Sequence, residues 1–184
     1  MKEPKILSKG NTALLIVDMQ EKLLPVVQNS EEITKNTIKL VEGFKILEQP
    51  VYYTEQYPKG LGATDIKIKN VFGELKSYEK NTFSCIGAGN LFETLSSNNV
   101  KNVVLCGIES HICVQQTYLD LIKSDFNVFL VADAVSSRKL IDYQTSLIRA
   151  QTNQVEIITT ESVLFELLKE SGSEQFKAIS KIIK

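Results

Sequence analysis

Short apolar runs alternate with amphipathic segments along most of this chain. Each run is rich in aliphatic residues and ends at a polar residue or a glycine, as buried parallel strands do. Most segments between the runs carry apolar residues at every third or fourth position, which indicates helices that pack one face on a sheet. The alternation predicts one α/β domain over residues 1–184, with three α/β/α layers and a parallel sheet. The expected strands are Ala13–Val17, Val51–Thr54, Lys101–Cys106, Asn127–Ala132 and Val155–Thr159.

The expected helices begin and end at residues suited to those positions. A long helix begins at Asn29 or Ser30, both good caps, and reaches about Leu47. From Tyr57 to Glu79 the periodicity is weak, which predicts a long and functional loop. The remaining expected helices are Asn90–Ser97, one from Cys113 onward, Leu140–Ala150, and Ser162–Lys169 and Ser173–Ile183 on either side of Gly172.

Composition and charge exclude several classes of protein. The chain is 43% hydrophobic and 23% charged, a typical globular balance, and its net charge of −1 argues against nucleic acid as a main partner. It contains no apolar run of the roughly 20 residues that span a bilayer, so no membrane partner is expected. Three cysteines without metal-type pairing, and an N-terminus without an apolar signal core, favour a reducing compartment. We expect a cytoplasmic protein, with association with mitochondria or another organelle left open.

The segment Leu105–Val114 carries the strongest chemical signal. It reads as a buried strand, a turn at Gly107 and a helix whose first turn contains Cys113. Unpaired N–H groups at a helix N-terminus lower the pKa of a thiol and can hold an oxyanion, so this placement favours covalent catalysis. The alternative interpretation is that Cys113 is a small core residue, as we expect Cys106 to be.

Two acidic residues end predicted strands, at the sheet edge where ligands bind in such folds. Asp18 follows the apolar strand expected at the sheet's centre, and a buried carboxylate there needs a cationic or proton-sharing partner. Asp133 fits better as a helix cap or a loop brace.

Several motifs, in order and spacing, resemble the isochorismatase-like cysteine hydrolases, the superfamily that includes nicotinamidases. The subgroup that the chain resembles most is the isochorismatase domain-containing proteins. The general motifs are Ile16–Gln20, Glu79–Ser84 and Gly107–Val114, and those of the subgroup are Thr54–Gly62, Val131–Arg138 and Gln175–Lys177.

This resemblance implies a Rossmann-like fold with a six-stranded, mostly parallel sheet, and an Asp18–Lys80–Cys113 triad. It also implies a cis peptide bond between Ile108 and Glu109, which would aim the N–H groups of Glu109 and Cys113 at one oxyanion. Asp18 would take the thiol proton while Lys80 keeps Asp18 ionised at rest. Cys113 would then attack a small amide or related C–N substrate and form a thioester.

The remaining expectations concern the pocket and the assembly. His111, the chain's one histidine, lies too close to Cys113 along the chain to serve as its base, and we expect it at the pocket rim. Family members commonly assemble as dimers or larger rings, so a homo-oligomer is expected. The substrate pocket of this small-molecule enzyme is expected to be lined by Gln20, Leu23, Tyr53, Gln56, Phe83, Glu109 and Ile112.

The sequence departs from the nicotinamidases that it resembles at one site. Tyr57 stands where the nicotinamidases carry a histidine ligand, so we expect neither a metal nor another cofactor, and a metal-dependent nicotinamidase is disfavoured. The thiol of Cys113 argues against isochorismate as the substrate, because hydrolysis of its vinyl ether needs acid catalysis.

A non-catalytic interaction or sensor protein remains the alternative, with a partner surface on the Tyr57–Glu79 loop and the C-terminal helices. A nuclease would need metal carboxylates or a basic groove, and neither is visible.

Overall fold

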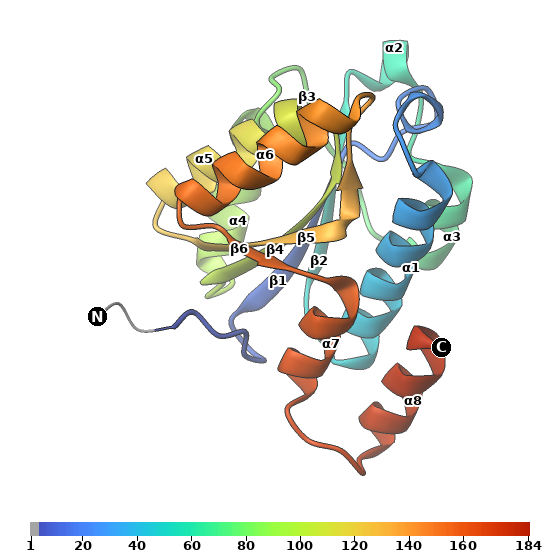
Figure 1. Cartoon of the computed structure of the whole chain (residues 1–184), viewed down its shortest axis with the longest axis vertical. Coiled ribbons are helices and arrows are strands. Elements are labelled where there is room, and N and C mark those ends of the chain that lie inside the picture. The colour runs from blue at the N-terminus through green and yellow to red at the C-terminus, as the bar shows by residue number, and fades with distance from the viewer. Residues whose placement is uncertain (1–3) are drawn as a thin grey trace.

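The computed structural model describes residues 4–184 and contains a six-stranded parallel sheet between two helical layers (Figure 1). The strand order is β3-β2-β1-β4-β5-β6, which confirms the expected three-layer α/β/α architecture. The strands are β1 (Thr12–Val17), β2 (Val51–Gln56), β3 (Tyr78–Lys80), β4 (Asn102–Ile108), β5 (Asn127–Ser136) and β6 (Glu156–Ile158).

Helices cover both faces of this sheet (Figure 1). One layer contains α1 (Ser30–Ile46), α3 (Ile66–Phe72), α7 (Thr160–Leu168) and α8 (Glu174–Ile183), and the other contains α4 (Leu91–Ser97), α5 (Gln115–Lys123) and α6 (Leu140–Thr152). Four short helical turns connect these elements: η1 (Leu24–Val26), α2 (Pro58–Leu61), η2 (Cys85–Gly87) and η3 (Ser110–Val114). Within the described part of the chain, no helix is long and apolar enough to cross a membrane.

The two central strands form the middle of the core. Every residue of β1 and of β4 is buried, because helices cover both faces of the sheet and neither strand lies at an edge. Full burial of a valine, leucine or isoleucine side chain contributes about 1.5–3 kcal/mol. The apolar runs therefore fix these strands at the centre, and their carboxyl ends carry Asp18 and the turn before Cys113.

Gly107 allows β1 and β4 to approach closely near their carboxyl ends. It pairs with Val17 and has a φ of +117°. A Cβ atom at this position would lie 2.1 Å from the carbonyl oxygen of Val17, so only glycine fits. The pairing of β4 with β5 also shifts register between Leu105 and Gly107. These two features set where the chain leaves β4 and turns toward Cys113.

The segment from Tyr57 to Glu79, expected to be a loop, is largely structured. It contains α2, α3 and most of the edge strand β3. The side chain of Asp65 accepts a hydrogen bond from Lys67 N at the start of α3, and Ile68 and Phe72 are buried one turn apart. β3 has only three residues and forms by pairing with β2, so its own hydrophobic pattern does not reveal it.

Candidate active site

A buried ion pair joins β1 to the edge strand β3. Asp18 follows β1 and Lys80 ends β3, and Lys80 Nζ lies 2.6 Å from Asp18 Oδ2 with both side chains fully buried. The same ammonium donates to Gln56 Oε1 at 2.7 Å, and to the carbonyl oxygens of Phe83 and Thr82 at 3.0 and 3.2 Å. Four oxygen atoms thus replace the water that a lysine normally keeps.

Asp18 also contacts the candidate nucleophile. Its Oδ1 accepts a hydrogen bond from Thr54 Oγ1 at 2.7 Å, and its carboxylate interacts with the thiol of Cys113. Burial raises the pKa of Asp18 above its usual 3.8, while the nearby Lys80 ammonium opposes the rise. A carboxylate with a raised pKa is a stronger base, which suits it to accept a thiol proton.

Cys113 lies on η3, a turn of π-helix that continues into α5. The peptide bond between Ile108 and Glu109 just before this turn is cis, at the position that the resemblance implies. Val114 N donates to Glu109 O at 3.2 Å and closes the wide turn. Burial, followed by the negative charge of Asp18, raises the pKa of Cys113 above its usual range. The expected lowering at a helix N-terminus is therefore wrong, because the thiol is enclosed rather than solvated.

A cavity of about 100 Å³ opens beside Cys113. Five of the seven residues expected in the pocket line it, namely Leu23, Gln56, Phe83, Glu109 and Ile112. Leu61 on α2 was not anticipated, because its helix lies in the segment expected to be a loop. The remaining lining residue is Cys113.

Gln20 and Tyr53 were expected in this pocket and lie elsewhere. The Gln20 side chain is fully buried, and it accepts from Gln56 N and donates to Gly62 O, which ties the α2 segment to β2. Tyr53 stacks on Phe72 of α3, with 4.3 Å between ring centroids. Side chains alternate along a strand, so Tyr53 faces away from the side on which its neighbour Thr54 contacts Asp18.

His111 is held by groups other than Cys113. Its Nδ1 lies 2.8 Å from Ser137 Oγ, and its Nε2 lies 3.8 Å from Asp142 Oδ2. Ser110 Oγ lies 2.5 Å from the same Ser137 oxygen. The imidazole therefore braces the turn before Cys113 against the loop between β5 and α6.

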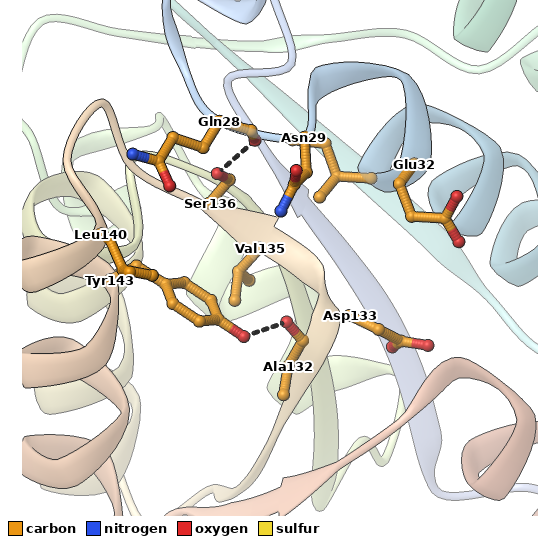
Figure 2. A pocket seen from close by; sticks show the side chains of 10 residues that line it. Gln28, Asn29, Glu32, Ala132, Asp133, Val135, Ser136, Leu140 and Tyr143 are labelled. Carbon is orange, nitrogen blue, oxygen red and sulfur yellow. Dashed lines mark hydrogen bonds between the residues drawn. The ribbon is translucent and has the colours of Figure 1, made fainter.

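A second cavity, of about 210 Å³, lies between α1, β5 and α6 (Figure 2). It is larger than the one at Cys113 but contains no member of the expected triad, so we do not assign it to the chemistry. Asp133 lines it, and its Oδ1 accepts from Thr160 N and Oγ1 at 2.8 and 3.0 Å. Asp133 thus fixes the start of α7, as the interpretation of it as a cap or brace predicted. The other lining residues include Gln28, Asn29, Glu32, Ser136, Leu140 and Tyr143.

Tyr57, which was expected to stand in place of a metal-binding histidine, has an exposed side chain and precedes α2. Across residues 4–184, no group of three or more His, Cys, Asp or Glu side chains could hold a metal ion.

Comparison with known proteins agrees with this fold. A family model, the isochorismatase domain, matches residues 12–162. Isochorismatase domain-containing protein 1 of Danio rerio is 38% identical over 97% of this chain, and the aligned region is 62% of that protein's length. Isochorismatase domain-containing protein 2 of Xenopus laevis is 36% identical over 96% of the chain and 85% of its own length. A solved structure described as MAR1 ribonuclease from Caenorhabditis elegans has a TM-score of 0.92 at 35% identity, covering 97% of this chain and 92% of that one.

The fold and these matches together define an α/β protein of the hydrolase type. The chain belongs to the isochorismatase family.

Proposed function

We propose that this protein is a cysteine-nucleophile hydrolase that cleaves a small amide or related C–N bond. The observation that carries the proposal is the buried Asp18–Lys80 pair in contact with Cys113, which itself lines a cavity. The reaction would pass through a thioester on Cys113. No step requires a metal ion or another cofactor.

The first step moves one proton and forms one bond. Asp18 accepts the proton of the Cys113 thiol, and the sulfur attacks the carbonyl carbon of the substrate. Neutralising Asp18 leaves the Lys80 ammonium without its carboxylate partner, so its charge then stabilises the thiolate and the developing oxyanion. The N–H groups of Glu109 and Cys113 would hold that oxyanion.

The second step releases the amine and then the acid. Asp18 returns its proton to the leaving nitrogen as the C–N bond breaks, which leaves a thioester on Cys113. Asp18, again ionised, takes a proton from water as the water oxygen attacks the thioester carbon. The C–S bond breaks, the acid leaves and the thiol regains its proton.

Trapping the thioester tests this proposal. The protein is mixed with a panel of small amides and quenched in acid, and its intact mass is measured. We expect an acyl adduct on the wild type and on Cys106→Ala, whose cysteine is buried in β4, and none on Cys113→Ala. Turnover that is equal in Cys113→Ala and the wild type would overturn the proposal.

Ribonuclease activity is a second candidate, because the Caenorhabditis elegans structure carries that name at 35% identity. The same variants decide between the two. RNA cleavage that Cys113→Ala retains, without turnover of any amide, would favour the ribonuclease.

A non-catalytic interaction or sensor role is the third candidate. Under that reading, Cys113 would resist iodoacetamide in the native protein while one of the other two cysteines reacts. The proposal predicts the opposite labelling, because Cys85 and Cys106 are fully buried and do not line the cavity.

The proposal includes a homo-oligomer in a reducing, cytoplasmic environment. The three free cysteines of the chain support a reducing compartment. Support for the assembly comes from α6, where Ile141 and Ile148 lie two turns apart with 64% and 65% of their surface exposed. Exposed apolar side chains grouped on one helix are typical of an interface.

A further inference from the structure

Glu109 lines the cavity beside the nucleophile, and its carboxylate has no place in the steps above. We infer that Glu109 determines specificity: its carboxylate rejects anionic substrates and accepts the N–H of a short, uncharged primary amide. This inference rests on the proposed function and names the substrate class of that same site.

The size of the cavity limits the acyl group. At about 30 Å³ for each water-sized group, 100 Å³ holds roughly three non-hydrogen atoms. Leu23, Leu61, Phe83 and Ile112 supply an apolar wall. A short aliphatic acyl group therefore fits the cavity.

The polar groups of Gln56, which also lines the cavity, are already used by the protein. Its Oε1 accepts from Lys80 Nζ at 2.7 Å, and its Nε2 donates to Asn81 O at 3.0 Å. Gln56 thus contributes its shape to the pocket and leaves hydrogen bonding with the substrate to other groups.

One of the two carboxylate oxygens of Glu109 is hydrogen-bonded to Arg138, and this holds the carboxylate in place. Its Oε2 lies 3.0 Å from Arg138 Nε and 3.3 Å from Arg138 N. Among the described residues, no donor contacts its Oε1. A fixed carboxylate oxygen without a donor is a strong acceptor, and the N–H₂ of a primary amide supplies what it lacks.

The nearby cations are not available to a substrate carboxylate. The ammonium of Lys80 contacts four oxygen atoms and is fully enclosed. Arg138 directs its Nε to Glu109, and its side chain is largely exposed, where solvent screens its charge. An anion in the cavity would therefore meet the Glu109 carboxylate, while Lys80 is already paired with Asp18 as long as Asp18 is ionised.

Two alkylating reagents of nearly equal shape test the inference without knowledge of the natural substrate. Iodoacetamide is a neutral primary amide, and iodoacetate is the corresponding anion. The rate of Cys113 labelling by each is measured by peptide mass spectrometry, and the ratio is divided by that for free N-acetylcysteine. We expect the wild type to favour iodoacetamide by at least about tenfold after this correction, as charge repulsion at short range implies.

Three variants sharpen the test. Glu109→Gln should bring the corrected ratio close to one, and Glu109→Asp, which keeps the charge, should retain most of the preference. Glu156→Gln on the edge strand β6, where the glutamate is exposed, serves as the matched control and should behave as the wild type. Thermal unfolding of each variant checks that it folds.

The outcomes separate the two proposals. If Cys113 is labelled but the corrected ratio is near one in the wild type, or is unchanged in Glu109→Gln, the inference is wrong and the proposed function stands. If neither reagent labels Cys113 and no amide is turned over, both are overturned.

Discussion

Lys80 Nζ and Asp18 Oδ2 lie 2.6 Å apart in an ion pair that is closed to solvent. Their strands, β3 and β1, are separated in the sheet by β2, so the pair spans three strands at their carboxyl ends. Breaking a buried pair by removing one partner leaves an uncompensated charge, which is more costly than losing the attraction itself. Removing either member of the pair should therefore change both the stability of the fold and the chemistry of the site.

Lys80→Met should lower the free energy of unfolding by about 3–5 kcal/mol, because Asp18 then loses its counterion in a fully buried site. Urea unfolding measures this change. Lys76→Met, on an exposed residue four positions earlier, is the control and should stay within about 0.5 kcal/mol of the wild type. Equal losses in the two variants would contradict the prediction.

The destabilisation in Lys80→Met should grow as pH rises from about 4.5 to about 8. Burial raises the folded-state pKa of Asp18 above 3.8, and removing Lys80 removes the main opposing effect. Over this range Asp18 of the folded variant holds a proton that the unfolded chain has released, so increasing pH lowers the free energy of unfolding of the variant. Urea titrations at several pH values measure how the free energy of unfolding changes with pH. A difference between variant and wild type that stays constant with pH would contradict the prediction.

Asp18→Asn should make Cys113 easier to alkylate while it abolishes turnover. The negative charge of Asp18 and its hydrogen bond with the thiol both raise the pKa of Cys113, and Lys80 lowers it. With Asp18 neutral, we expect iodoacetamide labelling at about pH 7 to accelerate roughly tenfold, and amide turnover to fall by at least about a hundredfold. Asp125→Asn, at an exposed residue with a φ of +62°, is the control. Slower labelling of Cys113 in Asp18→Asn would overturn this account.

Gly107→Ala should be more destabilising than the same change at another glycine with positive φ. At Gly107 the new methyl group would lie 2.1 Å from Val17 O, whereas at Gly172, with a φ of +90°, it meets nothing within 4 Å. We expect a loss of about 1–2 kcal/mol at Gly172, from backbone strain alone, and of more than about 3 kcal/mol at Gly107. Thermal and urea unfolding measure both, and similar losses would show that the close strand approach relaxes easily.

His111→Asn should retain most of the activity. The asparagine amide reaches about the position of the imidazole Nδ1, so the contact with Ser137 can persist. We expect kcat/KM to change by less than about tenfold, against complete loss in Cys113→Ala. Activity that disappears in His111→Asn without loss of stability would restore a catalytic role to the histidine.

Ile148→Glu should shift the protein to a smaller assembly if α6 forms the oligomer interface. A charge placed at the centre of that interface would be buried without a partner. Ile66→Glu, on α3 with a similar exposed fraction of 64%, is the matched control. Light scattering after size-exclusion chromatography measures the mass, and dissociation in the control alone would place the interface elsewhere.

The sequence predicts the central strands and the edge strand β6, and it misses the other edge strand, β3. β1 and β4 are buried on both faces, so their residues must be apolar and the pattern is unambiguous. β3 forms through hydrogen bonds to β2, which a hydrophobic pattern does not record. The helices α2 and α3 were missed for a related reason, since they have four and seven residues and hence little periodicity to detect.

For the site, the residues alone indicated Asp18 and Cys113, whereas Lys80 came from the family resemblance. Nothing in its local pattern separates Lys80 from the exposed Lys76, because the difference is the enclosure by four oxygen atoms. Strand alternation could have excluded Tyr53 once Thr54 was placed toward Asp18. The raised pKa of Cys113 depends on burial by distant segments, which sequence position does not give.

Leu61, which completes the cavity wall, has an implication for how relatives of this protein could diversify. It comes from α2, in the connection between β2 and β3, whereas Asp18 and Cys113 follow the central strands. Exchanging this connection for that of a homologue would reshape the binding cavity and leave the reacting groups on an unaltered scaffold. Point changes in α2, or a different connection, would thus alter the substrate range and leave the proposed reacting groups Asp18 and Cys113 unchanged.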